Sequence, residues 1–192
     1  MYIIKYERIF IEQFETYPKQ TFRNRCEMMS GNGKLNLIIP VNKPQGNRTP
    51  TKDVLISNQE KWQRNHWRAI TSAYLNSPYF EFYRDEIETF YMNKFDNLIQ
   101  FNHQLTDCVC KIIGIQKEFE FTETYHQSPS YTLDLRTVIN PKKEIKRELF
   151  PEYIQVFSSK LGFMPNLSII DLLFNLGPET LDYLKNIKLG EK

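Results

Sequence analysis

The clearest β-strand signal of the chain is Gly31-Asn-Gly-Lys-Leu-Asn-Leu-Ile-Ile-Pro-Val41. Gly31-Asn-Gly33 is a strong turn signal, and the apolar, β-branched run behind it predicts a strand over 35–41. A shorter apolar run predicts another strand over 9–13, and we expect these two strands to pair as a hairpin. Val54-Leu-Ile56 predicts a third strand, so the strands gather in the first third of the chain.

Helical patterns dominate the rest of the chain. Ser57-Asn-Gln-Glu60 has the spacing of a capping box and predicts the start of a helix. Apolar residues from Trp62 to Tyr74 then fall on one helical face, and Ser77-Pro78 ends the pattern. Further helical patterns cover 81–100, 105–113, 152–161 and 169–176, and short strands are expected at 119–122 and 131–138. We therefore predict an α/β fold, with a small β-sheet from the N-terminal third packed against a mostly helical remainder.

Length and composition bound the class of protein. With 192 residues the chain suits a single domain over 1–192, and its tail is expected to fray after about residue 188. Lys and Arg total 25 against 23 Asp and Glu, so the net charge of +2 predicts no nucleic-acid partner. The sequence has no apolar run of some 18 residues and no secretory leader pattern. We expect a soluble, cytoplasmic protein without a membrane span.

A basic stretch follows the first apolar run, at Tyr17-Pro-Lys-Gln-Thr-Phe-Arg-Asn-Arg25. If residues 20–26 are extended, Thr21, Arg23 and Arg25 share one face with Lys19. Three cations on one strand face favour a bridging anion such as a phosphate or a carboxylate. The alternative is a solvated strand face with no ligand.

The remaining chemical signals exclude more than they indicate. Cys26, Cys108 and Cys110 have no spacing that favours a disulfide or zinc, and the three histidines are far apart in sequence. No glycine-rich phosphate loop or nucleophile elbow is present, so we expect neither a metal nor a cofactor. His66 falls on the same helical face as Trp62 and Trp67. It is either a hydrogen-bonded core histidine or a general acid or base.

Five stretches together resemble the WbqC-like family, and the resemblance covers nearly the whole chain. They are Ile11–Cys26, Leu37–Val41, Trp62–Ile70, Tyr74–Phe80 and Pro165–Asn175. The family takes its name from a gene of bacterial O-antigen and polysaccharide clusters, so the resemblance implies a role in surface-polysaccharide or modified-sugar biosynthesis. Family members typically begin about twenty residues earlier, with a strand and a turn, and we expect this chain to begin inside the helix that follows, near Tyr2–Glu7.

Two hypotheses follow for the function. In the first, the protein is an enzyme acting on an anionic activated donor, and His66 is the general acid or base. Arg23 and Arg25 bind the anionic group, Lys19 adds charge, and Asn24 and Tyr74 orient polar substrate atoms. In the second, the protein is a non-catalytic binding or scaffold protein, whose basic strand and aromatic helix form an interaction surface. The sequence gives no indication of the oligomeric state.

Overall fold

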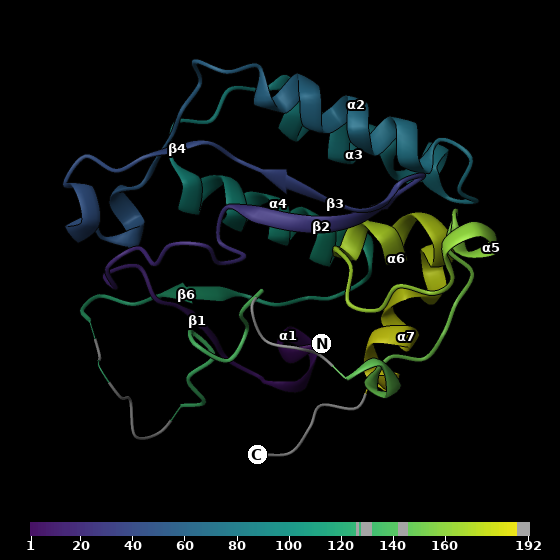
Figure 1. Cartoon of the computed structure of the whole chain (residues 1–192). Helices are drawn as coiled ribbons and strands as arrows, with labels where there is room; N and C mark the ends of the chain where they lie inside the picture. The colour runs from purple at the N-terminus through teal and green to yellow at the C-terminus, as the bar shows by residue number, and fades with distance from the viewer. Residues whose placement is uncertain (126, 128–131, 142–145, 188–192) are drawn as a thin grey trace.

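The computed structural model describes residues 1–125, 127, 132–141 and 146–187, and within these ranges it confirms an α/β fold of small sheets packed against helices (Figure 1). The strands are β1 (Ile9–Ile11), β2 (Arg25–Ser30), β3 (Gly33–Ile38), β4 (Val41–Asn42), β5 (Leu55–Ile56) and β6 (Phe119–Phe121). The α-helices are α1 (Tyr2–Lys5), α2 (Trp62–Tyr74), α3 (Phe80–Met92), α4 (Leu98–Ile112), α5 (Ser158–Leu161), α6 (Ile169–Leu176) and α7 (Thr180–Asn186). The described strands form three separate two-stranded sheets instead of one.

The central hairpin joins β2 to β3 and not β1 to β3, so the predicted pairing of 9–13 with 35–41 is wrong. Met28 lies opposite Leu35 in this antiparallel pair. The turn is closed by the Ser30 hydroxyl, which donates to the Gly33 carbonyl at 2.8 Å. Residues 25–30 immediately precede the turn, so they meet β3 with a far shorter loop than β1 could. Past Pro40 the predicted strand continues as β4, which pairs with β5.

The strands β1 and β6 pair in parallel, with Ile9 opposite Phe119 and Ile11 opposite Phe121. A parallel pair needs a long crossover connection, and here all of the chain from β2 to α4 lies between the two strands. Figure 1 shows the pair lying side by side, on the side of the β2–β3 hairpin away from α2.

Helix α2 buries the predicted face, including Trp62, His66 and Tyr74. It begins at Trp62 and not at the predicted capping box, because the Ser57 backbone and the Asn58 side chain have partners in other segments. The Ser57 amide donates to the Pro40 carbonyl, and the Asn58 side chain donates to the Phe95 carbonyl. The main core forms where α2 meets β2, β3, α3 and α6, around Met28, Leu37, Trp67, Ile70, Tyr74, Phe80, Ile87, Leu173 and Phe174.

The C-terminal part departs furthest from the helical prediction. Only Ser158–Leu161 is helical within the predicted helix 152–161, while the predicted helix over 169–176 is confirmed as α6. The expected strand over 131–138 is wrong for the described residues 132–138, which form bends and a turn. Residue 131 and the tail after 188 lie outside the described residues. Gly177 ends α6 with φ of +52°, and a Cβ there would lie 2.5 Å from the Tyr79 ring.

Candidate functional site

A cavity of about 340 Å³ lies where the β1–β6 pair meets α4. Its apolar walls come from α1, β1, α4 and β6, namely Ile3, Ile9, Phe10, Ile11, Leu98, Ile99 and Phe119. Its polar lining consists of Glu12, Glu15, Arg23, Thr51, Asn102, His103, Thr106 and Arg136. A cavity with apolar walls and a small number of convergent polar groups is the usual form of a small-molecule site.

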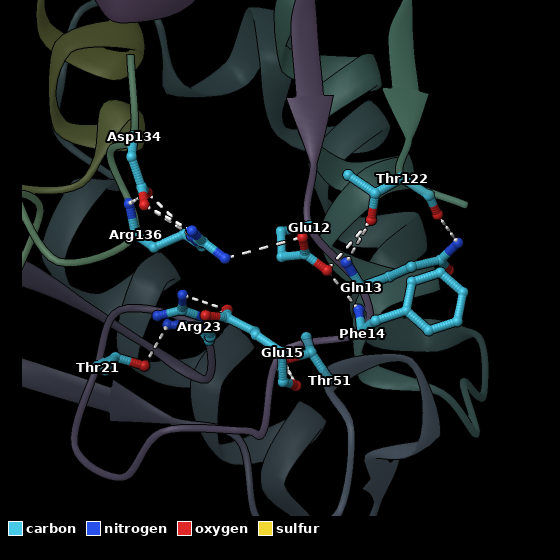
Figure 2. Close-up of polar contacts among 10 residues, drawn as sticks. All are labelled: Glu12, Gln13, Phe14, Glu15, Thr21, Arg23, Thr51, Thr122, Asp134 and Arg136. Carbon is cyan, nitrogen blue, oxygen red and sulfur yellow. Dashed lines mark hydrogen bonds and ion pairs between the residues drawn. The ribbon is translucent and has the colours of Figure 1, made fainter. Parts of the chain in front are cut away.

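The first ion pair of this site joins Arg23 to Glu15 (Figure 2). The Arg23 Nε donates to Glu15 Oε1 at 2.9 Å, and Nη2 donates to the same oxygen. The two side chains are only 20% and 13% exposed. Burial raises the pKa of Glu15 above its ordinary value, and the nearby Arg23 charge offsets this only in part. The ionised Glu15 carboxylate is therefore incompletely stabilised and accepts further hydrogen bonds readily.

The second ion pair links Glu12 to Arg136, whose segment follows β6 in the chain. Arg136 Nη1 lies 3.8 Å from Glu12 Oε2, and the guanidinium also binds Asp134 through Nε at 2.9 Å. The hydrogen bond from Arg136 lowers the pKa of Asp134. Figure 2 shows both ion pairs in one view, and all four of their residues line the cavity. The cluster of Glu12, Glu15, Arg23, Asp134 and Arg136 is hereafter called the charge cluster.

Backbone contacts position the charge cluster. The Glu15 carbonyl accepts from the Thr51 amide at 2.9 Å, and the Glu12 carboxylate accepts from the Phe14 amide at 2.7 Å. On the other side, Asn102 of α4 donates to the Arg23 carbonyl at 2.7 Å. The cluster is therefore held by segments that are distant in sequence but adjacent in the fold.

His103 also lines the cavity, next to Asn102 on α4. Its ring packs nearly perpendicular to the rings of Phe119 and Phe121, with centroids 5.7 and 5.1 Å away. Its Nδ1 is buried and has no hydrogen-bond partner among the residues that the structure describes. The His103 residue thus lines the cavity, while its Nδ1 is shielded from solvent.

The predicted basic strand face does not form. Residues 18–24 make bends and a turn, Gln20 has φ of +57°, and the Thr21 hydroxyl accepts from the Arg23 amide. Arg23 lines the cavity, whereas Lys19 is exposed. The sequence predicted a bound anion between the cations. For Arg23, the Glu15 carboxylate of the chain itself takes that position.

The two remaining predicted site residues of the basic stretch, Asn24 and Arg25, lie at the start of the hairpin. The Asn24 side-chain amide donates to the Ile39 carbonyl at 2.9 Å, so this hydrogen bond serves the fold. Arg25 opens β2, and its buried Nε has no hydrogen-bond partner within the described part of the chain. The charges of Arg23 and Arg25 both act on the pKa of Tyr17, which burial raises, so the two guanidiniums lie near the same phenol.

His66 and Tyr74 lie in the core and do not line the cavity. His66 Nε2 is 3.1 Å from the Ile38 carbonyl, and burial lowers the pKa of the imidazole. The Trp62 ring packs against it with centroids 5.2 Å apart. Tyr74 is fully buried and donates to Asp171 Oδ1 at 2.8 Å. The structure therefore brings only Arg23 of the predicted site residues to the cavity wall.

Sequence reasoning missed Glu12, Glu15, His103 and Arg136. Glu12 and Glu15 stand just before the basic stretch, and their closeness to Arg23 in sequence was a usable signal. Nothing in the sequence near Arg136 or His103 indicates that they meet the same cavity.

No three His, Cys, Asp or Glu side chains among the described residues are grouped closely enough to hold a metal ion. Among the same residues, no helix combines the length and the apolar character that crossing a bilayer requires.

Comparisons with known proteins give one family and one distant relative. The family model described as "WbqC-like protein family" matches residues 3–148, more than half of the chain and all of the described cavity lining. The chain is also similar to the "Uncharacterized protein Rv1507c" of Mycobacterium tuberculosis (strain ATCC 25618 / H37Rv). The two are 24% identical over 197 residues, covering 88% of this chain and 84% of the relative. No solved structure matches the chain with significance.

Proposed function

Because the chain belongs to the WbqC-like protein family, we propose that it is an enzyme of surface-polysaccharide or modified-sugar biosynthesis acting on an anionic activated donor. The observation that carries the proposal is the cavity of about 340 Å³ with the charge cluster on its wall. A volume of this size suits one part of such a donor. We also propose that the protein acts in the cytoplasm, and this part of the proposal rests on the sequence.

Arg25 is the proposed partner for the anionic group of the donor. Arg23 is already paired with Glu15, whereas Arg25 has a buried, unpartnered Nε among the described residues. A guanidinium binds phosphate and carboxylate in a bidentate manner, and Lys19 adds charge from an exposed position.

Glu15 is a better candidate than His66 for proton transfer. Glu15 lines the cavity, and burial raises the pKa of its carboxyl toward the range in which a general acid or base works. His66 is separated from the cavity lining and its Nε2 is bonded to the Ile38 carbonyl. The role expected for His66 from the sequence remains a prediction that mutation tests.

Ligand-dependent thermal unfolding tests the proposal. The panel contains nucleotide-activated sugars and acyl carriers, and a ligand at a hundred times its dissociation constant adds about 2.7 kcal/mol of stability. We expect one class to stabilise the protein, and the variants Arg25→Gln and Thr106→Phe to remove the shift, since Thr106 lines the cavity. Arg68→Gln, an exposed residue of α2, is the matched control and should keep the shift.

A non-catalytic binding protein is the second candidate, favoured by exposed apolar side chains near the α2–α3 connection. Leu75 is 51% exposed and Phe82 is 73% exposed. A panel in which no small molecule shifts the melting temperature would favour this alternative. A shift that survives Thr106→Phe would also count against the cavity as the binding site.

A further inference from the structure

Among the described residues, the Arg23–Glu15 pair on the cavity lining leaves one donor group and one acceptor atom without a partner. Both hydrogen bonds from Arg23 to Glu15 end on Oε1, through Nε and Nη2. Within the described residues, Nη1 of Arg23 and Oε2 of Glu15 carry no hydrogen bond, and neither belongs to the buried atoms that lack a partner. A ligand group that both donates and accepts therefore fits this end of the cavity.

The charge of the cluster decides which ligand groups it favours. Three carboxylates, Glu12, Glu15 and Asp134, face two guanidiniums, Arg23 and Arg136. With all five groups ionised the cluster carries a net charge of −1. A phosphate or carboxylate entering here would meet an excess of negative charge at low exposure, where repulsion is weakly screened. A cationic ligand would meet the unpaired donor of Arg23.

The rest of the described cavity lining is largely apolar. Ile9 and Ile11 of β1, Ile99 of α4 and Phe119 of β6 belong to it. Burying an apolar ligand surface there is favourable by about 25 cal/mol per Å². A ligand of this cavity thus has an apolar part and a polar, uncharged end.

We propose that the Arg23–Glu15 end of the cavity binds an uncharged hydroxyl- or amide-bearing group, with the apolar part of the same ligand against Ile9, Ile99 and Phe119. This inference rests on the proposed function and specifies which part of the donor the cavity holds: the neutral sugar or acyl part. The anionic group of the donor then lies outside the charge cluster, toward Arg25.

Three probes with the same alkyl chain and different head groups test the inference: hexyl β-D-glucoside, hexyl phosphate and hexylamine. Isothermal titration calorimetry on the full chain measures each dissociation constant at moderate salt. We expect hexyl β-D-glucoside to bind at least about tenfold more tightly than either charged probe, a difference of about 1.4 kcal/mol. Tighter binding of hexyl phosphate or of hexylamine would overturn the inference.

Glu15→Gln provides the second measurement. The substitution replaces the open acceptor by a donor and removes one negative charge, so we expect weaker binding of hexyl β-D-glucoside and tighter binding of hexyl phosphate. Thr106→Phe should weaken all three probes by filling the cavity, while Arg68→Gln should change none. Circular dichroism spectra and melting temperatures identify any variant that has lost its fold. If Glu15→Gln has lost its fold, Glu15→Asp replaces it. Glu15→Asp keeps the negative charge but has a shorter side chain, so it should weaken the binding of hexyl β-D-glucoside alone.

The result is separable from the test of the proposed function. If activated donors bind but hexyl phosphate is preferred in the cavity, the inference fails and the proposed function stands. If hexyl β-D-glucoside binds with the expected dependence on Glu15 and no activated donor does, the proposed function fails. In that case the inference that the cavity binds an uncharged hydroxyl- or amide-bearing group still stands.

Discussion

Two carboxylate-centred networks tie distant parts of this molecule together, and they differ in how their charges are compensated. In the charge cluster, Glu15 and Glu12 face arginines at the edge of a cavity. In the second network, Asp171 of α6 is fully buried and is bound by neutral groups. It accepts from the hydroxyls of Tyr74 and Tyr153 and from the Gln155 amide at 3.0 Å.

The comparison distinguishes a structural network from the network for which we propose ligand binding. The Asp171 oxygens receive three hydrogen bonds, and Gln155 also binds the backbone of Met164 through both ends of its amide. This network connects α2, α6 and the segment before α5, and both oxygens of Asp171 have hydrogen-bond partners. The charge cluster is only partly buried and, within the described part of the chain, keeps one donor and one acceptor without a partner. Saturation of the hydrogen bonds, and not burial alone, separates the two roles.

The largest expected effect is on stability, from Asp171→Ala. The substitution leaves Tyr74, Tyr153 and Gln155 without their shared acceptor, so we expect a loss of about 3 kcal/mol or more in the free energy of unfolding. Urea unfolding measures the loss. Asp182→Ala, on an exposed aspartate of α7, is the control and should stay within about 0.5 kcal/mol. A small loss of unfolding free energy for Asp171→Ala would contradict the structural role of the Asp171 network.

Arg23→Gln is expected to have a smaller effect on stability. It leaves the largely buried Glu15 carboxylate without its cation, at a cost of about 1 to 3 kcal/mol. The double variant Arg23→Gln/Glu15→Gln should recover most of this loss because neither charge remains. A double-mutant cycle measures the coupling. Strict additivity of the two single losses would show that the pair contributes no interaction energy.

His66→Gln sharpens the comparison by assigning His66 to one of the two classes. If His66 is a core residue, the loss of ring packing against Trp62 lowers the free energy of unfolding by about 1 kcal/mol, while binding of cavity ligands stays unchanged. The amide of Gln can renew the bond to the Ile38 carbonyl. Loss of turnover at unchanged stability would instead restore the catalytic role that the sequence suggested.

The smallest expected effect is a pH dependence of stability. Burial raises the pKa of Asp171, so ionisation of this group opposes folding. Its contribution to stability is fully present below the pKa of the unfolded chain, near 4, and is lost as pH rises through the higher folded value. Wild type should therefore gain stability relative to Asp171→Asn between pH 7.5 and 4.5, by up to about 1 kcal/mol. Equal pH profiles would contradict the raised pKa.

Several parts of the fold were predictable from local patterns. The buried face of α2 follows from apolar spacing, and α6 from its apolar run. The segment before α5 was predicted as a helix because its spacing is helical. There the Gln155 side chain binds the Met164 backbone, a tertiary interaction that local propensity does not include.

The candidate site was predictable only in part. The basic stretch located Arg23, but the extended conformation assumed for it was wrong because Glu15 pairs with Arg23 across a tight turn. Arg136 reaches the same cluster from more than a hundred residues away, through the pairing of β1 with β6. A single sequence contains no local signal for such a contact.

The parallel pairing of β1 with β6 has a consequence for the order of folding. The hairpin and the helices α2 to α4 form mostly near-neighbour contacts, whereas β1 meets a partner about 110 positions downstream. Long-range closure is entropically costly and generally late. During synthesis, the cavity therefore stays incomplete until β6 has emerged from the ribosome. A nascent chain stalled before residue 119 should contain the hairpin but not bind the proposed ligand.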